Sequence, residues 1–277
     1  MTNKVVHTTF GKLEYSLLGE GQPILFVHGG HSNAHERLSH KGFDPDKYQL
    51  ITPSRPGYGK TPLKQNETAR KAADLLKGLL DEINIDKVVV YGVSAGGLTA
   101  IELAANHPER VQKLVLASAI SKKWLTKDHK TYKTAQVLFN PNFQKLTWGA
   151  IRLLLRIAPV TTAKSFYQQF SKKPNPNIPI SDTKELISAL KFYDSGQGFI
   201  NDLEQTPSDS SLEKVICSTF IVHSHYDNSV PVAHAEHAHQ KIENSELLIL
   251  KNDWGHLFWI GEDSDVAIRK IIAFIEK

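Results

Sequence analysis

Residues 87–97 read Lys-Val-Val-Val-Tyr-Gly-Val-Ser-Ala-Gly-Gly, a short apolar run followed by a serine among small residues. The apolar run at residues 87–91 is typical of a strand that is buried on both faces. Residues 95–106 predict a helix, which ends before Pro108 because proline disfavours helical geometry at the residue that precedes it. Ser94 is therefore expected at a turn that joins a buried strand to a helix.

A turn of this kind restricts the residues around Ser94. A serine in strained backbone geometry needs small side chains two positions to either side, and Gly92 and Gly96 stand there. The turn lifts the hydroxyl above the sheet edge, and the helix behind it offers N-terminal amides and the positive end of its dipole to an oxyanion. We predict that Ser94 is a nucleophile. The alternative is a serine that only caps a helix.

On both sides of this turn, apolar runs and amphipathic stretches alternate along the sequence. Strands are expected at residues 23–28 and 114–117, with a helix over residues 67–83 between them. Strand and helix thus alternate over residues 23–118, which predicts an α/β fold with a mainly parallel sheet and helices on both faces. Further expected elements are a hairpin at 4–9 and 12–18, strands at 48–52, 217–223 and 246–250, and helices at about 232–242 and 264–276.

The alternation stops over residues 122–212, where aromatic-rich helical stretches occur without a buried strand. A length of 277 residues fits one domain that carries an insertion better than two equal domains. We therefore predict a core domain of residues 1–121 and 213–277, with residues 122–212 inserted as a helical cap.

Two later segments offer the groups that a serine nucleophile needs. Asp227 follows the predicted strand 217–223, at the edge where Ser94 is also expected. His256 follows the strand 246–250, and Gly255 before it allows the backbone to turn sharply. The alternatives are a solvated turn at the aspartate and a surface position for the histidine.

In this chain order, an elbow serine followed by an acid and then a histidine, the sequence resembles the α/β-hydrolase superfamily, in the branch with a helical cap. The resemblance implies a Ser94-His256-Asp227 triad and an acyl-enzyme. It also implies that backbone N–H groups of Gly30 and Ala95 form the oxyanion hole. The candidate substrate contacts are His31, Trp124 and Val230.

The broadest function that the resemblance implies is a hydrolase of the carboxylesterase type, acting on a small, partly apolar substrate without a cofactor. Carbon–carbon bond hydrolases use the same triad and remain open. Proline iminopeptidases usually continue a His-Gly-Gly start with Pro-Gly, and His31-Ser32 departs from that pattern. A ligand-binding protein on a hydrolase scaffold is the alternative from another class.

Histidines near the second half of the core raise the question of a metal. His223 and His225 are expected on one strand face, and His234, His237 and His239 follow at helical spacing. Two histidines at period two with a third nearby are able to bind zinc. Because neither a cysteine nor a clear carboxylate set completes the group, we expect a histidine-rich surface and no metal.

Composition limits the partners. The formal charge of +4 comes from scattered lysines without a basic run among aromatics, so no nucleic acid is expected. No stretch approaches the ~20 apolar residues of a membrane-spanning helix. The single cysteine, Cys217, excludes an internal disulfide and favours a reducing, cytoplasmic location. The oligomeric state is left open.

Overall fold

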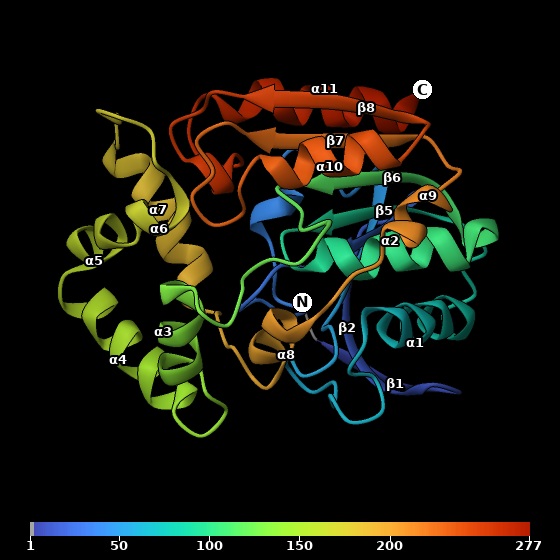
Figure 1. Cartoon of the computed structure of the whole chain (residues 1–277), viewed down its shortest axis with the longest axis horizontal. Coiled ribbons are helices and arrows are strands. Elements are labelled where there is room, and N and C mark those ends of the chain that lie inside the picture. Colours follow the sequence, from blue (N-terminus) through green and yellow to red (C-terminus); the bar gives the residue numbers. More distant parts are fainter. Residues whose placement is uncertain (1–2) are drawn as a thin grey trace.

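The computed structural model describes residues 3–277, and within them eight strands form one sheet in the order β1-β2-β4-β3-β5-β6-β7-β8 (Figure 1). All neighbours from β4 to β8 pair in parallel, and β2 runs antiparallel to both β1 and β4. The strands are β1 (Lys4–Thr8), β2 (Gly11–Leu18), β3 (Gln22–Val27), β4 (Tyr48–Pro53), β5 (Val88–Val93), β6 (Val111–Ala117), β7 (Thr219–Ser224) and β8 (Ser245–Leu250).

The central strands are apolar throughout because both of their faces are covered. On β3, Leu25 and Val27 pack into a cluster with apolar side chains of α1, α2 and α10, whereas Ile24 and Phe26 pack into a second cluster that contains residues of α11. The helices of the core are α1 (Ala69–Glu82), α2 (Gly96–Asn106), α10 (Ala233–Lys241) and α11 (Ser264–Glu276), with short 3-10 turns η1 (Leu38–His40), η2 (Pro108–Arg110) and η3 (Gly255–Leu257).

A block of helices follows β6 and lies beyond the carboxyl ends of the parallel strands (Figure 1). It comprises α3 (Lys130–Leu138), α4 (Gln144–Ile157), α5 (Pro159–Ser165), α6 (Tyr167–Phe170), α7 (Ile180–Leu190) and α8 (Gly198–Glu204). Helix α9 (Asp209–Glu213) follows them in the chain but lies beside α2 (Figure 1), where the Ser211 hydroxyl donates to Glu102 at 2.6 Å and Leu212 joins the cluster around α2. We call α3 to α8 the cap.

The expected fold class is confirmed, because each predicted strand and core helix is present to within a few residues. One placement is wrong: His225 lies in the turn after β7 and shares no strand face with His223. The division into a core and a cap insertion at residues 122 and 212 stays a prediction. In the part of the chain that the structure describes, no helix has the length and apolar character needed to cross a membrane.

Candidate active site

The turn between β5 and α2 holds Ser94 in the left-handed region, with φ of +49°. The flanking glycines are required by packing: a Cβ on Gly92 would lie 2.6 Å from the Ala100 side chain, and one on Gly96 would lie 2.2 Å from the Val27 carbonyl. A non-glycine residue at positive φ is unusual and persists only where surrounding contacts hold it. The Ser94 carbonyl accepts hydrogen bonds from the backbone of Ile120 and Gly97, which supply such contacts.

The three residues expected as a triad lie together at this edge of the sheet. His256 Nε2 lies 3.1 Å from Ser94 Oγ, and His256 Nδ1 lies 2.7 Å from Asp227 Oδ2. A hydroxyl that donates to Nε2 and an Nδ1–H that donates to the carboxylate satisfy both ring nitrogens of a neutral imidazole. Ser94 and His256 are 8% and 6% exposed, so the cap leaves the pair almost covered.

The carboxylate of Asp227 is buried and fully hydrogen-bonded. Its Oδ1 accepts from the backbone N–H groups of Ser229 and Val230, both at 2.8 Å, and its Oδ2 lies 3.1 Å from His223 Nε2 as well as near His256. Burial raises the pKa of Asp227, but the nearby histidines outweigh burial and hold that pKa at about 2. The group therefore stays ionised.

The loop that carries His256 depends on two local features. Gly255 has φ of +52°, and a Cβ there would lie 2.6 Å from the Phe170 carbonyl. Ser118, which follows β6 at φ of +48°, is fully buried and donates from Oγ to the His256 carbonyl at 2.9 Å. The end of β6 thus fixes the backbone of the histidine although it supplies no carboxylate.

The loop after β3 carries Gly30, one of the two candidate oxyanion residues, and the other, Ala95, directly follows Ser94 in the chain. A Cβ placed on Gly29 would lie 3.6 Å from Ser94 Oγ, so the loop passes directly beside the hydroxyl. Gly30 lies under the ring of Phe199 from α8, where a Cβ would lie 2.9 Å away. Ala95 is buried at the start of α2. That the N–H groups of Gly30 and Ala95 form an oxyanion hole stays a prediction.

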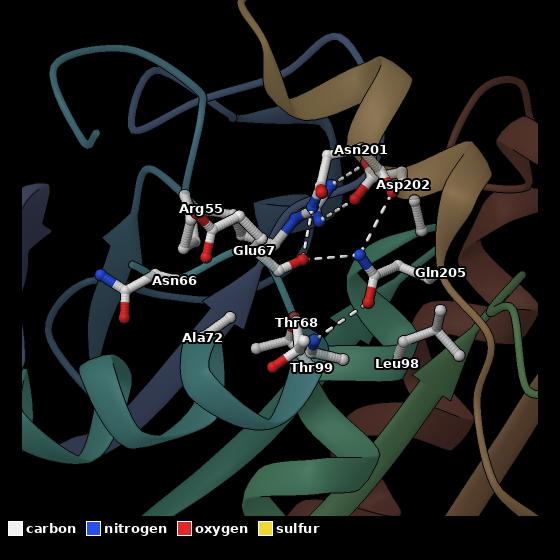
Figure 2. A pocket seen from close by; sticks show the side chains of 13 residues that line it. Arg55, Asn66, Glu67, Thr68, Ala72, Leu98, Thr99, Asn201, Asp202 and Gln205 are labelled. Atoms are coloured by element: carbon white, nitrogen blue, oxygen red, sulfur yellow. Dashed lines mark hydrogen bonds and ion pairs between the residues drawn. The ribbon is translucent and has the colours of Figure 1, made fainter. Parts of the chain in front are cut away.

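A buried ion pair ties that loop to the cap (Figure 2). Arg55 donates to the carbonyls of His28 and Gly29 and pairs with both carboxylate oxygens of Asp202 on α8, at 2.7 and 2.8 Å. Burial disfavours the charge, but Asp202 and Tyr58 leave the pKa of Arg55 above its ordinary value. The hollow in Figure 2 beside this pair has about 10 Å³, the room of about one water molecule.

The three candidate substrate contacts lie in different settings. The His31 ring packs against the ring of Phe199, with 3.7 Å between the ring centroids, and His31 Nδ1 lies 2.8 Å from Ser195 Oγ. Burial lowers the pKa of His31 to about 3. The Trp124 indole donates to the Ser229 carbonyl, and Val230 is fully buried beside Ala95. Whether any of the three binds a substrate stays a prediction.

The cap also contacts the loop that carries Asp227. Ser171 and Asp227 form an antiparallel bridge, flanked by hydrogen bonds from Lys172 N to the Tyr226 carbonyl and from Asn228 N to the Phe170 carbonyl. The ring of Phe170 lies parallel to that of His256 at 6.4 Å between centroids. The sequence did not predict four of these contacts: this backbone pairing, the approach of His223 to the carboxylate, the hydrogen bond from Ser118, and the Arg55–Asp202 pair.

The expectation of a histidine-rich surface is wrong in part, because His223 and His234 are buried. The His234 ring accepts from the Ser121 amide, His237 lies within hydrogen-bond distance of Ser121 Oγ and of Asp209, and His239 lies within hydrogen-bond distance of Ser245. Within residues 3–277 no group of three or more His, Cys, Asp or Glu side chains is placed to hold an ion.

Comparison with known proteins agrees with this architecture. A family model described as alpha/beta hydrolase fold matches residues 22–263. An uncharacterized hydrolase, YcgS of Bacillus subtilis, is 37% identical and the match covers all of both chains. A 2-hydroxy-6-oxononadienedioate/2-hydroxy-6-oxononatrienedioate hydrolase of Pseudomonas putida is 25% identical over 99% of this chain and 96% of its own.

Among solved structures, an alpha/beta hydrolase fold protein from Nakamurella multipartita superimposes with a TM-score of 0.81 at 25% identity, covering 98% of this chain and 97% of that one. The matched family region contains the elbow, the acid loop and the histidine loop. The chain is a hydrolase that belongs to the alpha/beta hydrolase fold family.

Proposed function

We propose that the protein is a serine hydrolase that cleaves a carboxylic ester of a small, partly apolar substrate. The observation that carries this proposal is the continuous hydrogen-bonded path from Ser94 Oγ through the His256 ring to a buried, ionised Asp227. Serine is a poor nucleophile at its own pKa, and such a path is the arrangement that activates it.

The reaction follows from these positions. Ser94 Oγ attacks the ester carbonyl carbon while His256 Nε2 takes the hydroxyl proton. Asp227 stabilises the imidazolium that forms. The tetrahedral oxyanion accepts hydrogen bonds from the N–H groups of Ala95 and Gly30. When the C–O bond breaks, His256 protonates the leaving alcohol and the acyl group stays on Ser94 Oγ. A water molecule then attacks the acyl carbon while His256 Nε2 takes a proton from it, and His256 returns this proton to Ser94 Oγ as the carboxylic acid leaves.

The apolar character of the substrate is inferred from the side chains around the triad. Phe170 faces the His256 ring, and Phe199 covers Gly30. Because aromatic surfaces from the cap meet both the base and the oxyanion loop, an acyl group with an apolar chain gains more from this site than a charged one.

A fluorophosphonate probe and a chain-length series test this function. We expect the probe to label Ser94, and the wild type to hydrolyse p-nitrophenyl acetate and butyrate at rates that Ser94→Ala lowers by a factor of about 10⁴–10⁶. Peptide mapping of the label to another serine, or equal turnover by both proteins, would refute the assignment.

Hydrolysis of a carbon–carbon bond is the second candidate, favoured by the relative from Pseudomonas putida that matches nearly the whole chain. The same triad serves that reaction. A vinylogous 2-hydroxy-6-oxo acid, assayed beside the p-nitrophenyl esters, separates the two: a kcat/KM at least a hundredfold higher on the oxo acid would replace the ester as the substrate class.

A further inference from the structure

The positive charge of the chain is concentrated in one segment. Residues 122–173 contain eleven Lys and Arg side chains and a single acidic one, Asp128, whereas the rest of the chain contains 22 Lys and Arg against 28 Asp and Glu. The first half of the cap is therefore strongly basic, while the rest of the chain, including α7 and α8, is net acidic. This segment includes α3 to α6.

Helix α4 in this segment has an apolar face that no described part of the chain covers. Leu146 and Ile157 are 75% and 71% exposed, and Leu153 and Leu154 are more than half exposed. Their spacing places them on one side of the helix. Trp148 and Leu155, on the opposite side, bury α4 against the other cap helices.

The exposed apolar surface continues beyond α4. Phe143, the N-cap residue of α4, is 61% exposed, and Val137 near the end of α3 is 70% exposed. The Thr147 hydroxyl of α4 donates to the Leu138 carbonyl at 2.7 Å, so the end of α3 lies against the start of α4. Large apolar patches of this kind on a protein surface mark an interaction site.

Basic side chains border this face. Each of three apolar residues on this face directly follows a basic one: Leu146 follows Lys145, Leu153 follows Arg152, and Ile157 follows Arg156. Because one residue corresponds to about 100° around a helix, the basic side chains form a stripe beside the apolar one. Arg152 donates to the Tyr193 carbonyl, while neither Lys145 nor Arg156 meets a carboxylate of residues 3–277. An apolar stripe beside a cationic one is the pattern of helices that lie in a membrane interface.

We infer that the outer face of the cap, formed by α4 and the end of α3, docks on an anionic lipid surface. The apolar stripe would enter the boundary between headgroups and acyl chains, and the cationic stripe would meet lipid phosphates. A second copy of the chain fits poorly, because two faces of the same strong positive charge repel. Nucleic acid fits poorly as well, because leucine and isoleucine neither stack on bases nor reach phosphates.

This face lies on the side of the cap that is turned away from the core. In Figure 1, α4 and α5 lie at the end of the molecule that is farthest from α10, α2 and the amino ends of the strands. Docking through this face would therefore neither cover the core nor require a membrane-spanning helix. The inference does not depend on the proposed esterase activity.

Vesicle co-sedimentation tests the inference directly. We expect the wild type to bind vesicles of phosphatidylglycerol and phosphatidylcholine, to bind pure phosphatidylcholine far more weakly, and to lose binding as NaCl rises from 0.1 to 0.5 M. Removing two cations in Lys145→Gln/Arg156→Gln should weaken binding by a factor of about 25, roughly fivefold per charge.

Matched variants separate the face from general surface effects. Leu146→Ser/Leu153→Ser/Ile157→Ser should weaken binding by about a thousandfold, because each of the three apolar side chains contributes about tenfold when it leaves water. The control Ile216→Ser/Val266→Ser removes exposed apolar side chains from the core, and should bind like the wild type. Ester turnover in solution should be the same in all of these proteins.

Three results would overturn the inference. One is equal binding to charged and neutral vesicles. Another is unchanged binding by the α4 variants. The third is a dimer, seen by analytical ultracentrifugation, that the Leu146→Ser/Leu153→Ser/Ile157→Ser variant dissociates, since it would assign the face to a second copy.

Discussion

In the sheet, Leu25, Val27 and Phe26 have no exposed surface, whereas on α4 of the cap Leu146 and Leu153 are more than half exposed. The core thus places nearly all of its large apolar side chains inside, and the cap leaves several outside. Burial of apolar area is the main source of folding free energy, so the cap gains less of it per residue than the core.

The difference implies that the cap depends on a few strong contacts with the core. These contacts are polar or mixed: the Arg55–Asp202 pair, the backbone bridge between Ser171 and Asp227, and the Trp254 indole that donates to Asp182 of α7 at 2.8 Å. Substitutions at such contacts should therefore be costly, and substitutions on the outer cap face should be nearly silent. The following predictions measure that contrast.

The largest effect is expected at the core side of the site. Asp227→Asn should lower kcat on p-nitrophenyl butyrate by a factor of about 10⁴, because the amide no longer holds the imidazole in the useful tautomer. Asp209→Asn is the matched control, since Asp209 also meets a histidine, His237, at 3.1 Å but lies on the surface. A near-normal rate for Asp227→Asn would place the acid elsewhere.

Two of the ion pairs that join core and cap differ in exposure: the side chains of Arg55 and Asp202 are buried, and those of Lys41 and Glu185 are 32% and 35% exposed. Asp202→Asn should reduce the free energy of unfolding by about 3–5 kcal/mol, because it leaves the buried Arg55 charge without its partner. Glu185→Gln, which breaks the pair with Lys41, should cost about 0–1 kcal/mol. Urea denaturation measures both, and similar losses would contradict the contrast.

Two leucines on α4 allow a buried and an exposed apolar side chain to be compared within a single helix. Leu155 is 5% exposed and Leu153 is 55% exposed. Leu155→Ala should cost about 2–5 kcal/mol of unfolding free energy through lost burial and a cavity, and Leu153→Ala less than about 0.5 kcal/mol. Equal costs would show that Leu153 is covered in solution.

A buried histidine of the core should make stability depend on pH. Burial lowers the pKa of His40 from 6.5 to about 3, so the folded state resists its protonation while the unfolded chain accepts it. The stability that the neutral His40 gives the folded state is fully present above pH 6.5 and is lost as the pH falls toward 3. By pH 5 the free energy of unfolding should have fallen by about 2 kcal/mol for this reason. His40→Gln should reduce the loss between pH 8 and pH 5 by that amount.

The matched control for this pH series is His7→Gln, because the His7 side chain is exposed and meets water in both states. Chemical denaturation at each pH gives the unfolding free energy. A slope that is the same for His40→Gln and the wild type would mean that His40 does not resist protonation in the folded protein.

The sheet was predictable because its central strands are covered on both sides. Such strands read as unbroken apolar runs, as in residues 87–91, and the turn at Ser94 follows from the glycines that packing requires. The positions of Asp227 and His256 were predictable for a related reason: parallel strands bring their carboxyl ends to one edge, so residues just after β7 and β8 meet there.

The remaining contacts depend on side-chain geometry that sequence patterns do not report. His223 was grouped with His225 as a metal candidate, but the two separate where β7 ends, and only His223 turns toward Asp227. Arg55 and Asp202 are far apart in the chain, and they come into contact only when the cap packs on the core. The helix bounds of the cap were not predictable, because exposed leucines on α4 blur the amphipathic pattern.

The bridge between Ser171 and Asp227 has a consequence for exchanging parts between relatives. The segment 168–172 lies within the cap in chain order, yet its backbone is paired with the loop that holds Asp227, the proposed acid of the triad. A chimera that receives another cap at residues 122 and 212 would also receive a foreign partner for that loop. Chimeras that retain residues 166–173 of this chain should keep Asp227 in position and change only the cap residues around the site.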